Sequence, residues 1–216
     1  MPTIDYRNSK GERVSGVTTI ISSNLGWNKQ PLMYWAWQQG KDGKAFRETS
    51  QAAADAGTIA HYLIECDIRG VPSETATFDK APLGKAETAY INFLEWKESM
   101  QFRVVAVEPH LVSERYQYGL TPDCVAEIKG KLALFDWKSG AGVYEDMLIQ
   151  LVSYRQGWEE NYPDQLLVGG FHLLRIDKET AHFSYFWWDV LPGAWESFLC
   201  LLQLHNAHKE LKRLSK

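Results

Sequence analysis

Hydrophobic and polar positions follow two different periods along the chain, which predicts a mixed α/β protein. Helical spacing and composition predict helices at 29–40, 51–68, 85–100 and 145–161. Strands are expected at about 103–113, 119–128, 131–138, 166–176 and 181–189. A final amphipathic helix should begin near Pro192, because proline is favoured in the first turn of a helix. The predicted order is therefore α-β-β-β-α-β, with a helical segment before it and a helix after it.

The centre of the chain predicts a tight hairpin. Only Lys129 and Gly130 separate the strand-like runs 119–128 and 131–138. Glycine supplies the positive φ that a two-residue hairpin loop needs. A loop of this length fixes which residues face one another, and a slip of one residue would turn every side chain to the other face.

That register places two carboxylates together. Asp123 falls directly opposite Asp136, and Lys138 points to the same face as Asp136 because strand side chains alternate. Like charges at facing positions are destabilising. A hard divalent metal bound by oxygen ligands would offset them. An isolated Asp-x-Lys triplet, in contrast, is also explained by a simple surface ion pair or by exposed charges at a strand end.

Both faces of the second hairpin strand carry hydrophobic side chains, which predicts a buried central strand. One face carries Leu132 and Leu134, and the other carries Ala133, Phe135 and Trp137.

Two further groups flank the hairpin. His61 follows Gly57 in a segment of helical composition, and Gln150 and Tyr154 are four residues apart, hence neighbours on one helix face. Taken separately, a histidine on a helix surface and a polar helix edge explain them. Taken together and in this order along the chain, these residues match a known pattern of motifs.

The ordered set resembles the RecB-like branch of the PD-(D/E)XK nuclease superfamily. The opening Val17–Ile21 and Leu32–Trp37 also look like the lead-in of mitochondrial and phage exonucleases of this branch. The resemblance covers roughly residues 15–175, and its motifs are specific as an ordered set rather than singly. They stand here as Gly57-Thr-Ile-Ala-His61, Gly119-Leu-Thr-Pro-Asp123 (one residue longer than the tightest form), Asp136-Trp-Lys138 and Gln150-Leu-Val-Ser-Tyr154.

The resemblance implies a restriction-endonuclease-like α/β core that hydrolyses phosphodiester bonds with Mg²⁺ or Mn²⁺, leaving a 5′-phosphate and a 3′-hydroxyl. It implies that Lys138 orients or deprotonates the attacking water, with its pKa lowered by a neighbouring cation. Gln150 and Tyr154 would brace Lys138 or touch substrate. The implied metal ligands are His61, Asp123, Asp136 and the backbone carbonyl of Trp137.

The implied protein is a single nuclease domain, with an N-terminal arch segment (1–50), a catalytic core (51–190) and a C-terminal helix (191–216). We expect a DNA exonuclease acting on single-stranded ends in recombination, repair or phage DNA metabolism, with recombination or replication proteins as further partners. An endonuclease of the same fold and a catalytically idle DNA-binding member stay open. In the arch segment, Trp27, Trp35 and Trp37 either stack on bases or pack in the core.

The cysteines argue against the iron–sulfur cluster that several relatives carry on four cysteines. This chain has three, at Cys66, Cys124 and Cys200, and none forms a short Cys-x-x-Cys pair. We expect them to be buried free thiols and the protein to have no iron–sulfur cluster.

Composition and charge narrow the expected class and substrate. The 216 residues are 45% hydrophobic and 13% aromatic, which is typical of a globular domain rather than a disordered chain. No signal peptide or membrane-spanning run is apparent, so we expect the cytoplasm of a microbial or virus-infected cell. The net charge of −4 favours weak, metal-dependent binding of single-stranded nucleic acid over tight binding of a duplex.

Basic residues nevertheless gather in three places. The C-terminal group is expected to complement the end of a helix rather than to bind DNA. The groups are Arg7, Lys10 and Arg13; Lys80 and Lys85 in a loop; and Lys209, Lys212, Arg213 and Lys216.

Overall fold

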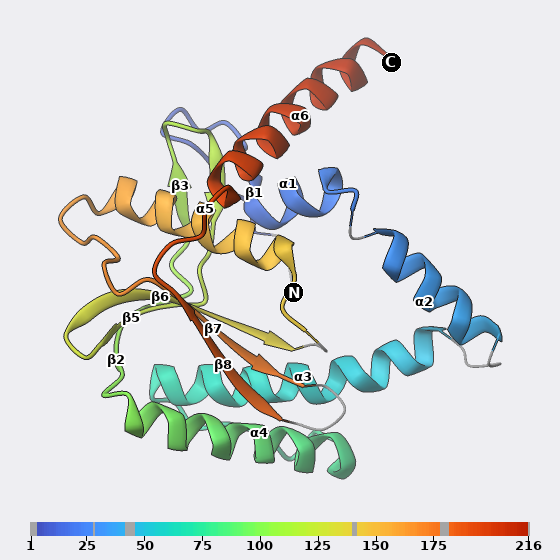
Figure 1. The fold of residues 1–216 in the computed structure, drawn as a ribbon, viewed down its shortest axis with the longest axis vertical. Coiled ribbons are helices and arrows are strands. Elements are labelled where there is room, and N and C mark those ends of the chain that lie inside the picture. The colour runs from blue at the N-terminus through green and yellow to red at the C-terminus, as the bar shows by residue number, and fades with distance from the viewer. Residues whose placement is uncertain (1–3, 28, 42–45, 140–141, 178–181, 216) are drawn as a thin grey trace.

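A mixed five-stranded sheet lies between two layers of helices in the computed structural model (Figure 1). Residues 4–27, 29–41, 46–139, 142–177 and 182–215 are described. The sheet order is β2-β5-β6-β7-β8, and a smaller sheet has the order β1-β4-β3. The strands are β1 (Ser15–Gly16), β2 (Arg103–Val107), β3 (Leu111–Ser113), β4 (Tyr118–Leu120), β5 (Cys124–Ile128), β6 (Lys131–Ser139), β7 (Phe171–Ile176) and β8 (Phe183–Trp188).

Helices cover both faces of the large sheet. α3 and α4 lie on one face, and α5, α1 and α6 lie on the other (Figure 1). The helices are α1 (Val17–Asn24), α2 (Lys29–Lys41), α3 (Phe46–Arg69), α4 (Lys80–Ser99), α5 (Glu145–Asn161) and α6 (Ala194–Leu214). The predicted α/β class and the order α-β-β-β-α-β are confirmed.

Strand β6 separates two hydrophobic cores, as its alternating pattern predicts. Leu134 packs with residues of α1, α5 and α6, whereas Phe135 and Trp137 pack with residues of α3 and α4. Burying both faces removes a large apolar area from water and fixes β6 at the centre of the sheet.

The hairpin between β5 and β6 has the predicted register. Both loop residues have positive φ, 49° at Lys129 and 76° at Gly130, as a type I′ turn requires. The ladder runs from Ile128 opposite Lys131 to Cys124 opposite Phe135. Asp123 lies one residue before this ladder, in register with Asp136.

The predicted strand at 119–128 is wrong, because two strands of different sheets share this segment. β4 pairs with β1 and β3 in the small sheet, whereas β5 belongs to the large one. The residues between them include Pro122, which has no N–H to donate to a ladder. Asp123 therefore sits where the chain passes from one sheet to the other.

Three other predicted boundaries also change. The strand predicted at 103–113 is divided at Glu108, whose φ of 43° interrupts extended backbone. The strand predicted from residue 166 begins at Phe171, after Gly170 with a φ of 89°. Lys80 and Lys85 lie in α4 rather than in a loop, and α1 was not predicted as a helix.

The ring of Tyr6 explains the glycine that opens the second motif. A Cβ atom on Gly119 would lie 2.0 Å from Cγ of Tyr6, and one on Gly16 would lie 2.9 Å from Cε2 of the same ring. The Tyr6 hydroxyl is 2.7 Å from Oγ1 of Thr121. The N-terminal segment thus packs directly on the backbone that leads to Asp123.

None of the helices in the described ranges is both long enough and apolar enough to cross a membrane.

Candidate active site

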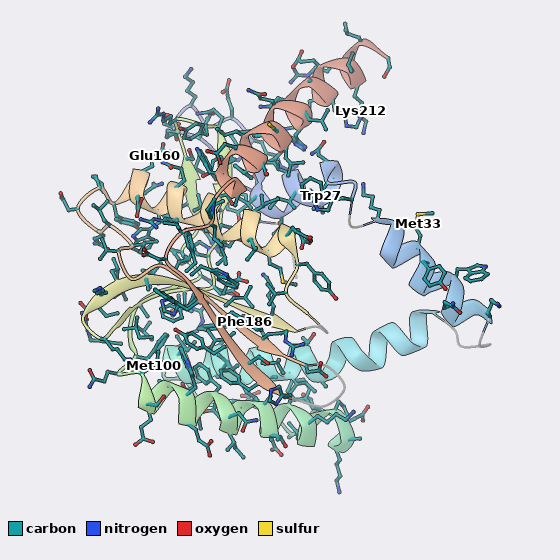
Figure 2. The ribbon with its side chains drawn as sticks, in the orientation of Figure 1. Trp27, Met33, Met100, Glu160, Phe186 and Lys212 are labelled. Atoms are coloured by element: carbon teal, nitrogen blue, oxygen red, sulfur yellow. The ribbon has the colours of Figure 1, made fainter. Side chains whose placement is uncertain are left out.

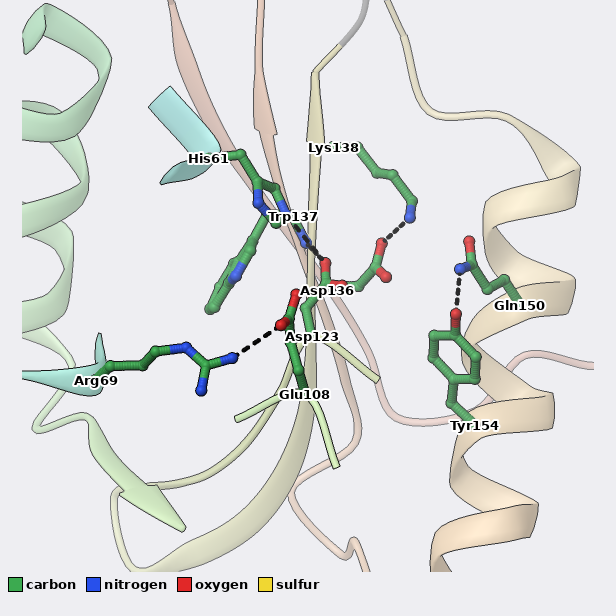
Figure 3. A network of polar contacts seen from close by, with 9 residues as sticks. All are labelled: His61, Arg69, Glu108, Asp123, Asp136, Trp137, Lys138, Gln150 and Tyr154. Atoms are coloured by element: carbon green, nitrogen blue, oxygen red, sulfur yellow. Dashed lines mark hydrogen bonds and ion pairs between the residues drawn. The ribbon is translucent and has the colours of Figure 1, made fainter. Parts of the chain in front are cut away.

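The side chain of Asp136 is fully buried in the central strand β6. Its side chain has 0% exposure, and Nζ of Lys138 lies 2.6 Å from its Oδ2 (Figure 3). Within the described part of the chain, neither carboxylate oxygen accepts a hydrogen bond of ordinary geometry. Burial raises the pKa of Asp136 to about 7, an effect that Lys138 opposes and Asp123 reinforces. Among the described residues its one polar partner is Lys138, which is fewer than buried carboxylates normally have.

Asp123 lies beside Asp136, in an environment that favours the ionised form of its carboxylate. Its Oδ2 accepts a hydrogen bond of 2.8 Å from the backbone N–H of Trp137 and lies 3.6 Å from Nε2 of His61. Burial acts to raise the pKa of Asp123, but His61, Lys138 and the Trp137 N–H together lower it. The surroundings therefore favour the ionised form of Asp123 more strongly than that of its neighbour Asp136.

His61 reaches this pair from α3, on the sheet face opposite α5 (Figure 3). Burial acts to lower the pKa of His61, but Asp123 and Asp136 raise it overall. The His61 side chain is 25% exposed and that of Asp123 19%, against 0% for Asp136. Lys138 is 21% exposed, so solvent reaches the residues around Asp136 but not Asp136 itself.

Lys138 is held as a cation in this arrangement. Burial acts to lower its pKa, but Asp136 and Asp123 raise it above the ordinary value. This direction is opposite to the one expected beside a bound cation, since here the neighbours of Lys138 are carboxylates.

Gln150 and Tyr154 form a pair on α5. Nε2 of Gln150 donates a hydrogen bond of 2.6 Å to the Tyr154 hydroxyl, and Figure 3 shows both side chains on the helix beside Asp136 and Lys138. Burial, followed by Asp136 and Asp123, raises the pKa of Tyr154 well above its ordinary value. Among the described contacts neither side chain touches Lys138, so bracing of Lys138 stays a prediction.

The donor types at this site fit a hard divalent cation. Two carboxylates and an imidazole converge near the ends of β5 and β6. Apart from the ion pair of Oδ2 with Lys138, the oxygens of Asp136 have no polar partner among the described residues, and carboxylate oxygens are ligands that such a cation prefers. In the described residues, however, no three His, Cys, Asp or Glu side chains are already grouped as a metal site.

Arg69 is a neighbour of the site that the sequence analysis missed. It donates hydrogen bonds of 2.8 Å to Glu65 and to Glu108, and the backbone N–H of Glu108 donates to the carbonyl of Asp123 at 3.0 Å. The four-residue spacing of Glu65 and Arg69 was the available signal. This network ties α3 to the backbone at Asp123.

Glu127, a further acid of β5, forms an ion pair with Arg103 on the neighbouring strand.

The tryptophans of the N-terminal segment are mostly exposed. Trp27 and Trp37 are 58% and 55% exposed, and Met33 and Tyr34 are also exposed. Core packing is therefore wrong for Trp27 and Trp37. Figure 2 shows Met33 on α2, away from the layers of the sheet. The side chain of Trp35 lies outside the described residues.

The three cysteines differ in burial. Cys66 and Cys124 are buried as expected, but Cys200 is exposed. Its position on α6 faces away from Phe198 and Leu201, which pack into the core, so the expectation of burial is wrong there.

Comparisons with known proteins show what the whole chain is similar to. The chain is 23% identical over 217 residues to human mitochondrial genome maintenance exonuclease 1, across 94% of this chain. A crystal structure from Eubacterium rectale, described as that of a candidate exonuclease, superposes with a TM-score of 0.52 and 14% identity over 71% of this chain and 65% of that one. The chain shares its fold with that structure. The resemblance predicted from the ordered motifs is thereby confirmed.

Two further facts bound these similarities. The chain spans 61% of the length of the human relative. No protein-family model matches the chain.

Proposed function

We propose that the protein is a divalent-metal-dependent DNA exonuclease that hydrolyses phosphodiester bonds at single-stranded ends. The similarity to an exonuclease over most of the chain supports a nuclease. The observation that carries the proposal is the Asp136 carboxylate, fully buried, with neither oxygen hydrogen-bonded among the described residues and with Lys138 and Asp123 beside it.

The residues that would hold the metal are those that converge on this carboxylate. A bound Mg²⁺ or Mn²⁺ would polarise a phosphoryl oxygen and lower the pKa of a coordinated water. The ligands would be His61, Asp123, Asp136 and the backbone carbonyl of Trp137. No iron–sulfur cluster forms part of the proposal.

The chain's own residues supply the remaining requirements. Asp123 is kept ionised by the Trp137 N–H and His61, so one anionic ligand is ready before substrate arrives. Lys138 lies 2.6 Å from Asp136, where it can orient an attacking water or neutralise charge on the transferring phosphoryl group. Gln150 and Tyr154 hold each other in place on the facing helix and would contact substrate.

The surface of the protein is better suited to flexible single-stranded DNA than to a rigid duplex. The exposed side chains of Trp27 and Trp37 offer stacking surfaces, and a net charge of −4 does not provide a broad basic face for a duplex. A single strand entering by its end needs only local contacts. DNA metabolism in recombination, repair or phage replication, with protein partners, is the setting that we propose.

Incubation of the full chain with end-labelled single-stranded DNA tests the proposal, with and without Mg²⁺ or Mn²⁺. Cleavage that requires the metal and is lost in Asp136→Asn supports it. Asp164→Asn is the matched control, because this exposed residue lies in the loop after α5, away from the site. Retained DNA binding without cleavage under every metal condition would instead indicate an idle DNA-binding member.

A further inference from the structure

A cavity lies outside the site described above. Its volume is about 570 Å³, and it is formed by the segment 4–16, the start of α1 and the C-terminal part of α6. Two cations and three aliphatic hydroxyl groups line it, and none of its described lining residues is acidic. These polar residues are Arg13, Lys209, Ser15, Thr18 and Thr19.

We propose that this cavity binds a phosphate group of the substrate strand. The inference rests on the proposed function for the identity of the ligand, and on the cavity itself for its chemistry. Cationic and hydroxyl donors converging without a carboxylate are suited to a phosphate oxygen, which accepts charge-assisted hydrogen bonds.

The hydrogen bonds of Ser15 leave one donor for a ligand. Nδ2 of Asn24 donates to Nδ1 of His205 at 3.1 Å, so the proton of a neutral His205 ring is on Nε2. Nε2 then donates to Oγ of Ser15 at 2.9 Å, and Lys209 donates to the same oxygen at 2.7 Å. Because this oxygen already accepts twice, the hydroxyl proton of Ser15 is free to donate into the cavity.

The two cations of the cavity have few acidic partners. In the described structure Lys209 contacts no carboxylate, and burial together with Arg213 and Arg13 lowers its pKa. Arg13 has one acidic partner, with Nε 3.1 Å from Oδ1 of Asp5, and Asp5 is shared with Arg7. An anion in the cavity would relieve the repulsion between these positive groups.

Lys209 was expected to complement the end of a helix, and the fold instead brings its Nζ to Oγ of Ser15, far away in the chain. Thr18 and Thr19 lie in the first turn of α1, where backbone N–H groups have no partner within the helix. The N-cap residue Gly16 makes no side-chain capping bond to them, so these N–H groups are further donors beside the cavity.

The cavity shares its support with the candidate active site. Gly16 pairs with Gly119 in the small sheet, and the same strand continues toward Asp123. Tyr6 lines the cavity and bonds through its hydroxyl to Thr121. A strand whose phosphate occupied the cavity would therefore be held by the same scaffold that positions Asp123.

Binding measurements on the full chain test the proposal without any cleavage. Fluorescence anisotropy of a labelled single-stranded oligonucleotide in EDTA is compared between the wild type, Arg13→Gln/Lys209→Gln and the charge-matched control Lys80→Gln/Lys85→Gln on α4. We expect about tenfold weaker binding by the cavity variant alone, and a salt dependence whose log–log slope is smaller by roughly 0.7 for each phosphate that the variant no longer neutralises. Equal affinities and slopes for the two double variants would overturn the proposal.

A second variant and a second probe complete the test. Ser15→Ala leaves both cations in place and should weaken binding by a smaller factor, and thermal unfolding of each variant verifies its fold. Titration with inorganic phosphate distinguishes the sources: phosphate bound in the cavity with oligonucleotide affinity unchanged in the variants would assign the cavity to a free phosphate and overturn the strand assignment. Wild-type DNA binding through the cavity without metal-dependent cleavage would instead overturn only the proposed catalysis.

Discussion

The carboxylate of Asp123 accepts a hydrogen bond of 2.8 Å from the backbone N–H of Trp137, at the end of the β5–β6 hairpin opposite its turn. The bond fixes Asp123 one residue beyond the regular ladder and adjacent to Asp136. The pKa values of these two neighbouring carboxylates move in opposite directions: that of Asp123 is lowered and that of Asp136 is raised to about 7. Pairs whose pKa values are separated in this way are typical of sites where acids have different roles.

Asp136→Ala and Lys138→Ala are expected to abolish cleavage by different routes. Asp136→Ala should weaken metal binding, because it removes a proposed ligand. Lys138→Ala should keep the metal, because it removes only the competing cation 2.6 Å from Oδ2 of Asp136, while the cleavage rate falls by about 10²–10⁴-fold. Calorimetric titration with Mn²⁺ on both variants measures the difference, and equal metal affinity of Asp136→Ala and wild type would remove Asp136 from the ligand set.

Linear single-stranded DNA should be degraded faster than circular single-stranded DNA of equal length and sequence. The physical reason is that a strand held by local stacking and phosphate contacts would enter by a free end, without a broad basic surface. The two substrates are compared at equal metal concentration by gel electrophoresis. Similar rates for both would show that no end is needed, and the endonuclease alternative would then replace the exonuclease.

Trp37→Ala is expected to weaken binding of single-stranded DNA by about 1–3 kcal/mol if a base stacks on its ring. Its side chain is 55% exposed, with Nζ of Lys41 4.7 Å from the ring centre, so its removal should cost little stability. Anisotropy measures the affinity, and Trp187→Ala, an equally exposed tryptophan on β8, provides the comparison. Matching affinities of the two variants would argue against stacking on α2.

Gly119→Ala should destabilise the fold by about 1–3 kcal/mol, because the added methyl would overlap the Tyr6 ring. The control is Gly84→Ala on the exposed surface of α4, where no atom lies within 4 Å and alanine should stabilise the helix by about 0.5–1 kcal/mol. Urea unfolding measures both. Tyr6→Ala in the Gly119→Ala background should restore part of the loss, and a wholly additive effect would show that the two residues do not clash.

Acid should destabilise the protein through His172. Burial lowers the pKa of His172 to about 4, where Nδ1 is 2.7 Å from the Tyr185 hydroxyl and Nε2 is 3.0 Å from the Gly169 carbonyl. In the unfolded chain the pKa is about 6.5, so between these values only the unfolded state takes up the proton. The contribution is complete above about pH 6.5 and is lost as pH falls to about 4, with a total of about 3 kcal/mol.

Urea unfolding of wild type and His172→Asn over this pH range isolates the effect, since the other titrating groups are shared. The stability difference between the two proteins should shrink as pH falls. A difference that stays constant with pH would show that His172 does not titrate as described.

The hairpin and the site at its mouth could be predicted because both depend on local rules. Lys129 and Gly130 fix the register through turn geometry, and the register then places Asp123 beside Asp136. The division of 119–128 between two sheets depends instead on pairing with Ser15 and Gly16, about a hundred residues away. Nothing in the local pattern of hydrophobic residues reports that pairing.

The same limit applies to side chains whose environment comes from distant segments. The positive pKa shift of Lys138 reflects carboxylates on two strands, and the exposure of Cys200 depends on which face of α6 meets α5. The meeting of Lys209 with Ser15 likewise follows from tertiary packing. Sequence patterns identify which groups carry chemistry, and the fold decides which of them meet.

The contact of Tyr6 with Gly119 has a practical consequence for handling the protein. Because residues near the N-terminus pack on the strand that leads to Asp123, proteolytic trimming or a bulky fusion at that end would disturb the positioning of an aspartate more than a hundred residues away. The other end of the chain differs, since α6 runs out from the body of the molecule and Leu214 is 84% exposed (Figure 1). An affinity tag or a surface-immobilisation linker therefore belongs after α6, where it leaves the strand beneath Tyr6 untouched.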